Sequence, residues 1–417
     1  MAPKLLRVLA RSFSTSSSKR GQSTRCLSSI HGAVVRDGYE SPIQRGKIWN
    51  FSAGPAMNCE SVMQQAQNEF LNYQNSGMGF LELSHRDAGG PVQNLMVETQ
   101  RIMRDLLQVP DDYHILFMHG GAHLQFSAVP LNLLNGKTTA GYVDTGFWSM
   151  RSANHAKKYC IVETPSVNRG TLLPTTEWNV SSDMAYVHVC MNETIAGLEY
   201  LYDPDLSHIE DAPPLVADAT STLLSRPVDI SKYGVIFASS GKNLGPAGIC
   251  TVIVKDELLK RNAHEMIPEM LDWREQANSS PIQNVYNTPP TFNIYMLNKT
   301  LKEYWKQGGL EAMDEKAERL SSLCYNFIDS SELFVPVVKH DQKRYRSRMN
   351  VCFQVGENGN IAIEEQVTRE AARHGIHQLF GHPLSGGLRI TLYNPMPEEA
   401  VHDLLRFLEY FESNFRR

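Results

Sequence analysis

Residues 234–254 read GVIFASSGKNLGPAGICTVIV, and this stretch decides the fold. Two apolar runs without polar alternation flank a turn of small residues, which is typical of strands buried on both faces of a sheet. Lys242 stands in the turn, where it is either a solvated hairpin residue or an amine held partly out of water as a nucleophile toward an aldehyde. Gly241, Gly245 and Gly248 allow the backbone to approach a flat ring closely.

Similar apolar runs occur earlier in the chain and alternate with helical patterns. The runs are HILFM (114–118), AGYVD (140–144), MAYVHVC (184–190) and PLVAD (214–218), and the helical patterns include SVMQQAQNEFLNYQ (61–74) and VQNLMVETQRIMRDLL (92–107). This alternation predicts an α/β fold with a mostly parallel central sheet and helices on both faces. Such sheets bind ligands at the carboxyl ends of their strands, so the polar residues that end each run are the candidate site.

The chain divides into a leader and two predicted domains. Residues 46–303 are expected to form the large domain, with 46–59 packing on the small one. Residues 304–417 are expected to form a smaller α+β domain, because helical patterns at 310–329 and 398–413 enclose strand candidates RMNVCFQV (348–355) and GLRITLYN (387–394).

The leader is basic while the rest of the chain is acidic. The formal net charge is −5, yet the first 36 residues contain seven Lys or Arg and no Asp or Glu. An Arg- and Ser-rich, acid-free segment predicts an organelle transit peptide over 1–45, for the mitochondrion or alternatively a plastid; a disordered basic tail is the other interpretation. The acidic body argues against nucleic-acid binding, and no apolar run reaches the ~18–20 residues of a membrane span.

Metal and disulfide chemistry find little support in the sequence. The seven cysteines contain no Cys-x-x-Cys pair and are expected to be buried free thiols. His119 and His123 have the spacing of metal ligands on a helix, but Gly120 and Gly121 between them disfavour a helix there. No metal site is predicted.

Asp218 supplies the second chemical element, since it ends the run PLVAD. A carboxylate at the end of a buried strand needs a positive or hydrogen-bonding partner. The protonated nitrogen of a pyridine ring is one such partner and makes that ring an electron sink; a helix N-cap is the alternative role.

The third element is a phosphate site in HGGAHLQFSAVPLNLL (119–134), which reads as strand end, glycine turn and helix. Backbone N–H groups of Gly121, Ala122 and His123 would open the helix and bind a phosphate. Trp148 is placed to stack on a ring and Thr194 to donate to a ring oxygen, although each is also explained as a core or turn residue.

Ten ordered motifs resemble the phosphoserine aminotransferase family. They are NFSAGPA (50–56), LSHR (83–86), HGGAHLQFSAVPLNLL (119–134), VDTGFW (143–148), NETIAG (192–197), ADATSTLLSRPVD (217–229), GKNLGPAG (241–248), YNTPPTF (286–292), RSRMNV (346–351) and GGLRITLYN (386–394). The resemblance runs from about residue 48 to the end. It implies the type I fold of enzymes that use pyridoxal 5′-phosphate and a homodimer with active sites at the subunit boundary.

The resemblance also implies the reaction and the role of each site residue. The reaction is transamination between O-phospho-L-serine and 2-oxoglutarate, giving 3-phosphohydroxypyruvate and L-glutamate in serine biosynthesis. Catalysis is assigned to Lys242, which links covalently to the cofactor, and to Asp218, which binds the ring nitrogen. Cofactor contacts are assigned to Ala122, His123, Trp148, Thr194 and Gly241, and to Asn287 and Thr288 from the neighbouring subunit. Substrate contacts are assigned to Ala53, His85, Arg86, His382 and Arg389, with Arg389 on the α-carboxylate.

Three positions depart from the family pattern. Gly241 replaces a glutamine, which removes one side-chain donor to the cofactor phosphate and leaves Ser239 or Ser240 to compensate. His123 replaces a different side chain in the glycine turn. Pro383 replaces an arginine that holds the substrate phosphate, so a shifted, unphosphorylated amino-acid substrate is the alternative function. Lys339, Lys343 and Arg344 are candidates to replace that arginine.

Overall fold

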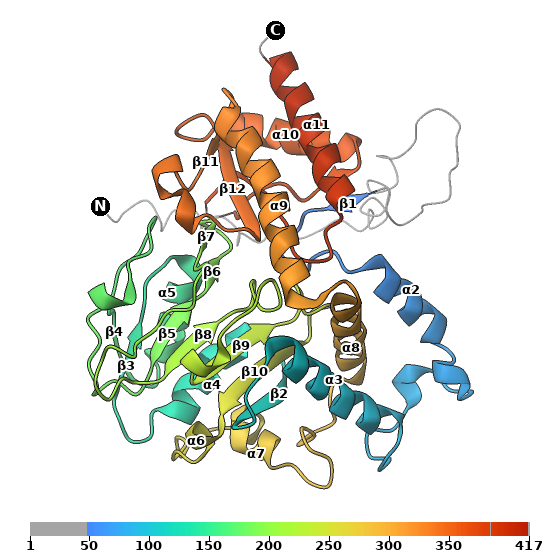
Figure 1. Cartoon of the computed structure of the whole chain (residues 1–417), viewed down its shortest axis with the longest axis vertical. Coiled ribbons are helices and arrows are strands. Elements are labelled where there is room, and N and C mark those ends of the chain that lie inside the picture. Colours follow the sequence, from blue (N-terminus) through green and yellow to red (C-terminus); the bar gives the residue numbers. More distant parts are fainter. Residues whose placement is uncertain (1–47, 384, 416–417) are drawn as a thin grey trace, which may run out of the picture. The chain divides into compact units, whose positions relative to one another are not determined.

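A seven-stranded sheet lies at the centre of the residues that the computed structural model describes, 48–383 and 385–415 (Figure 1). Its order is β2-β10-β9-β8-β5-β3-β4. The strands are β2 (Tyr113–His119), β3 (Thr139–Tyr142), β4 (Ile161–Glu163), β5 (Val187–Cys190), β8 (Leu215–Asp218), β9 (Val235–Ser239) and β10 (Ile249–Lys255). Only β10 runs antiparallel to its neighbours, which confirms the predicted mostly parallel sheet. The predicted transit peptide, 1–45, lies outside the described residues.

The antiparallel strand is explained by the turn that contains Lys242. In the β9–β10 hairpin Cys250 pairs with Ser239, and Gly241 N–H donates to the Gly245 carbonyl at 2.6 Å. Gly241 and Gly245 have φ of +104° and +94°, which residues with a Cβ rarely adopt. The turn therefore presents Lys242 at the carboxyl end of β9, beside the end of β8.

Helices cover both faces of the sheet, as predicted. Alternate residues of β2 point to opposite faces: Ile115 packs in the core cluster with α3 (Pro91–Leu107) and α8 (Thr291–Lys306), while Leu116 packs with α4 (Ala122–Leu133). The shorter α5 (Phe147–Ala156) and α7 (Trp273–Ala277) add Ala156 and Trp273 to the second cluster. A strand that is apolar at every position is the sequence signature of this double coverage.

The C-terminal region forms a second core around a three-stranded antiparallel sheet, β11-β12-β14. Its elements are α9 (Gly309–Ser330), β11 (Phe334–Pro336), β12 (Asn350–Val355), α10 (Ile361–Arg373), β13 (Ile376–His377), β14 (Leu388–Thr391) and α11 (Glu398–Phe415). The helices and strands that the sequence predicts in this region are present. The domain boundary near residue 304 stays a prediction.

The first described residues belong to this second core. The short strand β1 (Trp49–Asn50) pairs parallel with β13, and the Trp49 indole donates to Asp403 Oδ2 of α11 at 2.7 Å. Phe51 is 0% exposed within the same cluster. These contacts hold the loop that follows, residues 52–55, against the C-terminal region.

Two further expectations concern membrane spans and thiols. No helix among residues 48–383 and 385–415 is long and apolar enough to cross a membrane. The six cysteines in that part of the chain are free thiols, and all but the half-buried Cys160 are buried, as predicted. Cys26 lies outside the described residues.

Replacing Phe51 tests how much the N-terminal segment contributes to stability. Phe51→Ala leaves a cavity in the second core and should cost about 3–5 kcal/mol of unfolding free energy. Phe415→Ala removes the same atoms from a side chain that is 43% exposed and should cost about 0.5 kcal/mol or less. Urea unfolding followed by circular dichroism measures both, and equal losses would show that the segment does not contribute to the core.

Candidate active site

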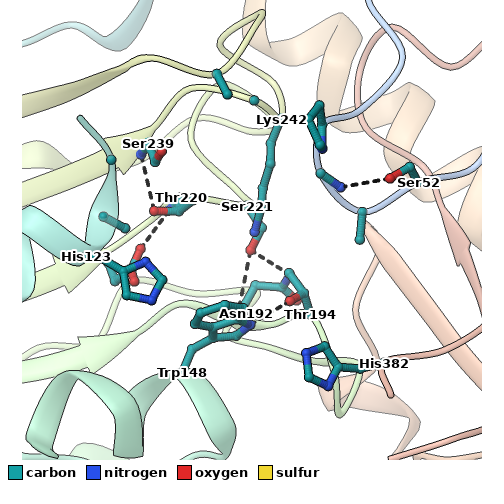
Figure 2. A pocket seen from close by; sticks show the side chains of 18 of the residues that line it. Ser52, His123, Trp148, Asn192, Thr194, Thr220, Ser221, Ser239, Lys242 and His382 are labelled. Atoms are coloured by element: carbon teal, nitrogen blue, oxygen red, sulfur yellow. Dashed lines mark hydrogen bonds between the residues drawn. The ribbon is translucent and has the colours of Figure 1, made fainter. Parts of the chain in front are cut away.

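One cavity of about 740 Å³ collects most of the predicted site residues (Figure 2). Its walls are the carboxyl ends of β8 and β9, the start of α4, the loop at 52–55 and the segment 378–383. The predicted residues that line it are Ala53, Ala122, His123, Trp148, Thr194, Asp218, Gly241, Lys242, His382 and Arg389. This is the edge of the sheet at which α/β proteins bind ligands.

Lys242 and Asp218 line this same cavity from adjacent strand ends. Lys242 Nζ lies 6.0 Å from the centre of the Tyr393 ring, and its side chain extends into the cavity (Figure 2). Asp218 is 6% exposed, and its Oδ1 accepts a hydrogen bond from the Thr220 N–H at 3.0 Å. Burial raises the pKa of Asp218 above its ordinary value, while Thr220 and the charge of Lys242 oppose that rise.

Asp218 is therefore a buried carboxylate with few partners, facing a space large enough for a ligand. The hydrogen bond from Thr220 belongs to a turn that follows the strand. No helix begins at Asp218, so this residue is not a helix N-cap. A cationic ligand group at this position would supply the stabilisation that the protein side leaves incomplete.

Trp148 and Thr194 are joined by a hydrogen bond in the cavity wall. The Trp148 indole N–H donates to Thr194 Oγ1 at 2.8 Å (Figure 2). Trp148 is the second residue of α5, and Thr194 follows the short strand β6 (Asn192–Glu193), which pairs with β7 (Leu198–Glu199). The indole is thus fixed with one face available to the cavity instead of being free to rotate.

Glu193 fixes this wall from behind, and the sequence did not reveal it. Its fully buried carboxylate accepts hydrogen bonds from the N–H groups of Trp148 and Ser149, both at 2.9 Å, and from the Thr145 hydroxyl at 3.2 Å. Burial raises the pKa of Glu193, and these bonds partly offset the increase. A carboxylate at a helix N-terminus is stabilised by the helix dipole, so Glu193 ties β6 to the start of α5.

A helix N-terminus lies where the phosphate site is predicted, at the start of α4. Gly121 is the N-cap, and the helix begins at Ala122, so the backbone N–H groups at this end are directed toward the cavity. A Cβ added to Gly121 would lie 3.1 Å from Ser239 Oγ, so this serine borders the glycine turn. The Ser239 N–H donates to the Thr220 hydroxyl at 3.2 Å, which places a second hydroxyl beside the same turn.

The two serines proposed to compensate for Gly241 are not equivalent. Ser240 Oγ donates to the Ile249 carbonyl at 3.0 Å and accepts from the Ile249 N–H at 3.1 Å, so it closes the β9–β10 hairpin. Ser239 Oγ donates only to the neighbouring Ser240 carbonyl and can still accept. The geometry thus favours Ser239 over Ser240 as the extra hydroxyl at the phosphate site.

Arg389 reaches the cavity from β14. Its Nη1 donates to the Thr194 carbonyl at 2.9 Å, which leaves the rest of the guanidinium available to a ligand. Tyr393, on the chain just after β14, donates its hydroxyl to the Ala53 carbonyl at 3.1 Å and positions the 52–55 loop. His382 lies with its ring 5.4 Å from that of Phe147, and Pro383 is also part of the lining.

Several predicted residues lie outside the cavity lining. His85 is half-buried, whereas Arg86, Asn287 and Thr288 are exposed; their assigned roles stay predictions. None of the three candidates to replace the arginine at position 383 lines the cavity. Lys339 pairs with Glu357 at 2.6 Å, and Arg344 lies over the Tyr345 ring.

Comparison with known proteins is consistent with this geometry. Residues 48–404 match the family model described as aminotransferase class-V. The chain is 41% identical to a phosphoserine aminotransferase of Nitrosomonas europaea, over 88% of this chain and 99% of that one. It is 42% identical to the enzyme of that name from Acidithiobacillus ferrooxidans, over 87% and 98%.

Solved structures give the same result. A phosphoserine aminotransferase from Bacillus circulans subsp. alkalophilus superposes with a TM-score of 0.82 at 34% identity, over 88% of this chain and 99% of that one. The phosphoserine aminotransferase of Trichomonas vaginalis, solved with pyridoxal phosphate bound, has a TM-score of 0.80 at 35% identity, over 87% and 99%. With the sheet order, the cavity and near full-length identity in agreement, the chain belongs to the class-V aminotransferase family and, within it, to the phosphoserine aminotransferases.

Proposed function

We propose that this chain transfers the amino group of O-phospho-L-serine to 2-oxoglutarate, giving 3-phosphohydroxypyruvate and L-glutamate, as a step of serine biosynthesis. The observation that carries the proposal is one cavity lined by Lys242, Asp218 and Arg389 in a chain 41% identical to a phosphoserine aminotransferase over 88% of its length. An amine, a buried carboxylate and a guanidinium are the groups that amino-group transfer on an amino acid requires.

The family implies pyridoxal 5′-phosphate, and the cavity fits it. Asp218 lacks a cationic partner beyond Lys242, which the protonated ring nitrogen would provide. The glycine turn before α4, with Ser239 and Thr220 beside it, suits the phosphate. Lys242 would form the covalent link, Trp148 would stack on the ring, and Thr194 would meet its hydroxyl.

When bound, pyridoxal phosphate withdraws electrons from the substrate Cα and weakens its C–H bond. Arg389 binds the α-carboxylate and orients the amino acid. The Lys242 amine would take the proton from Cα as a general base and deliver it to the cofactor carbon C4′ as a general acid; in the second half-reaction it would move a proton in the opposite direction. Asp218 would keep the ring nitrogen protonated, and Trp148 would stack on the ring.

We also infer a homodimer in which each subunit completes its neighbour's site. Asn287 and Thr288 are exposed and lie outside the cavity of their own chain, as a contribution to another subunit requires. His85 and Arg86 likewise lie outside the lining of their own cavity. The transit peptide and a mitochondrial or plastid location rest on the composition of residues 1–45 alone.

Pro383 favours the alternative of an unphosphorylated substrate, because it lines the cavity where the family pattern has an arginine. Turnover of phosphoserine, serine and alanine with 2-oxoglutarate decides between the two. Phosphoserine should be preferred over the others by at least about tenfold in kcat/KM, the value of one charge-assisted bond. Equal turnover of the three amino acids would exclude the proposed substrate.

Replacing Lys242 tests the catalytic assignment. Lys242→Ala should abolish the visible absorbance band of the lysine-linked cofactor and reduce turnover to background, because no other lysine of residues 48–383 and 385–415 lines the cavity. Lys260→Ala removes an exposed lysine that pairs with Asp256 and should leave both unchanged. A normal band and normal turnover in the Lys242 variant would refute the assignment.

Replacing Asp218 should have opposite effects on the empty and the loaded protein. Since burial raises the pKa of Asp218 above its ordinary 3.8, the empty protein is stabilised below that value and loses this stability as pH rises through the raised pKa. At pH 8 empty Asp218→Asn should therefore be more stable than the empty wild type, by about 1–3 kcal/mol.

The cofactor-loaded Asp218→Asn variant should show the reverse, with turnover reduced about 100-fold or more, since the ring nitrogen loses its carboxylate. Thermal melts of the empty protein at pH 8 and pH 5, with the advantage smaller at pH 5, measure the first effect. A variant less stable than wild type when empty would contradict the role of an under-partnered carboxylate.

The two serines of the hairpin form a matched pair. Ser239→Ala should raise the Kd for pyridoxal phosphate about 5- to 10-fold, the value of one hydrogen bond, without changing the stability of the empty protein. Ser240→Ala should instead lower that stability by about 1 kcal/mol, because the hairpin loses two bonds to Ile249. Fluorescence titration and thermal melts distinguish the two outcomes, and reversed effects would exchange the roles.

A further inference from the structure

Arg151 lies on α5, the helix that carries Trp148. Residues three and four apart lie on one helix face, so Trp148, Arg151 and His155 share a face of α5. The His123 ring lies 5.9 Å from both the Trp148 ring and the His155 ring. His123 therefore packs against the face of α5 that carries Arg151. His123 is itself part of the cavity lining.

A second chain of contacts connects Arg151 to the other histidine of the cavity. Its Cζ lies 5.8 Å from the centre of the Phe147 ring, which in turn lies 5.4 Å from the His382 ring. Burial lowers the pKa of His123 and of His382, and the charge of Arg151 adds to both effects. Arg389 also lowers the pKa of His382, so the charges of both guanidinium groups act on this histidine.

The Arg151 guanidinium is available to a ligand. It is exposed, and within residues 48–383 and 385–415 it makes no ion pair or hydrogen bond. The nearby arginine of the next segment, Arg169, is already paired with Asp144 at 2.7 Å. In the described part of the chain, Asp218 is the one carboxylate that lines the cavity, and it lies at the end of β8. Among the described residues, the Arg151 guanidinium is thus a cation without an anionic partner.

We propose that Arg151 binds the distal phosphate of phosphoserine, supplying a guanidinium in place of the one that Pro383 cannot provide. The proposal rests on the proposed function, since it assigns the distal end of that substrate. Arg389 binds the α-carboxylate and Arg151 the phosphate. A planar guanidinium suits both groups because it donates two parallel hydrogen bonds to a phosphate or carboxylate.

Kinetics of three variants test this assignment. Arg151→Gln should lower kcat/KM for phosphoserine by about 10- to 100-fold, the value of one charge-assisted bond. The loss for glutamate should be several-fold smaller, because its distal carboxylate carries less charge. Arg151→Lys should recover part of the loss by restoring the charge without the fork. Lys157→Gln removes one exposed charge at the end of α5 and should change both values by about twofold or less.

Direct binding separates affinity from chemistry. Titration of 3-phosphohydroxypyruvate, which carries the same phosphate but has no amino group to transfer, into each loaded variant, followed by the visible cofactor band, should give a Kd for Arg151→Gln raised by about the same factor as the loss in kcat/KM. Similar losses in Arg151→Gln and Lys157→Gln, or an equal loss for phosphoserine and glutamate, would overturn the proposal. If the wild type does not turn over phosphoserine, the proposed function is wrong. If the wild type does turn it over and Arg151→Gln does so equally well, only the role of Arg151 is wrong.

Discussion

The site depends on the cost of keeping a carboxylate at Asp218 out of water. A buried strand ends in this residue, and the protein supplies only Thr220 and the charge of Lys242 against the loss of hydration. A fold optimised for stability alone would place an apolar residue or a full set of donors here. The strand order places the Lys242 turn next to this strand end, so the incomplete pairing becomes a binding position for a cationic ring. Stability is given up at one residue, and the ligand restores it.

The fold was largely predictable because its strands are buried on both faces. The stretches 115–118 and 214–217 are apolar at every position, and this pattern has few explanations besides a covered, mostly parallel sheet. The pattern did not reveal that β10 pairs with β2. The direction of β10 is set by the nine-residue turn after β9, and its partner is set by which edge of the sheet is still unpaired. Residues 46–59 were expected to pack on the C-terminal region, but the pairing of β1 with β13 was not predicted, since two-residue strands have no periodicity to detect.

The site could be predicted at positions where a charged residue ends a buried strand, because few other roles explain such a residue. It could not be predicted where a residue's role depends on contacts that only the fold creates. Lys242 and Asp218 were found from their positions at strand ends. Glu193 was missed, because a glutamate before a threonine in a turn has many ordinary uses, and only the fold places its carboxylate under the start of α5. Ser239 and Ser240 are indistinguishable in sequence. They differ in the structure because successive residues of a strand point to opposite faces, so only one of them can face the glycine turn.

The contrast between Arg389 and Arg151 follows from what each must bind. Every amino acid and 2-oxo acid in the proposed reaction has the same carboxylate beside the reacting carbon, so its binding group can be fixed, and Arg389 is held by the Thr194 carbonyl. The distal group alternates between a phosphate and a carboxylate at different distances from Cα. A long, exposed side chain on a helix, such as Arg151 on α5, can reach the distal group of either substrate. A side chain fixed in a loop such as 378–383 would suit a substrate of one length only. Because rotamer freedom is lost on binding, the adaptable arginine gives less affinity per contact than a fixed one. Proline at position 383 is thus compatible with phosphoserine as substrate when the distal cation comes from α5.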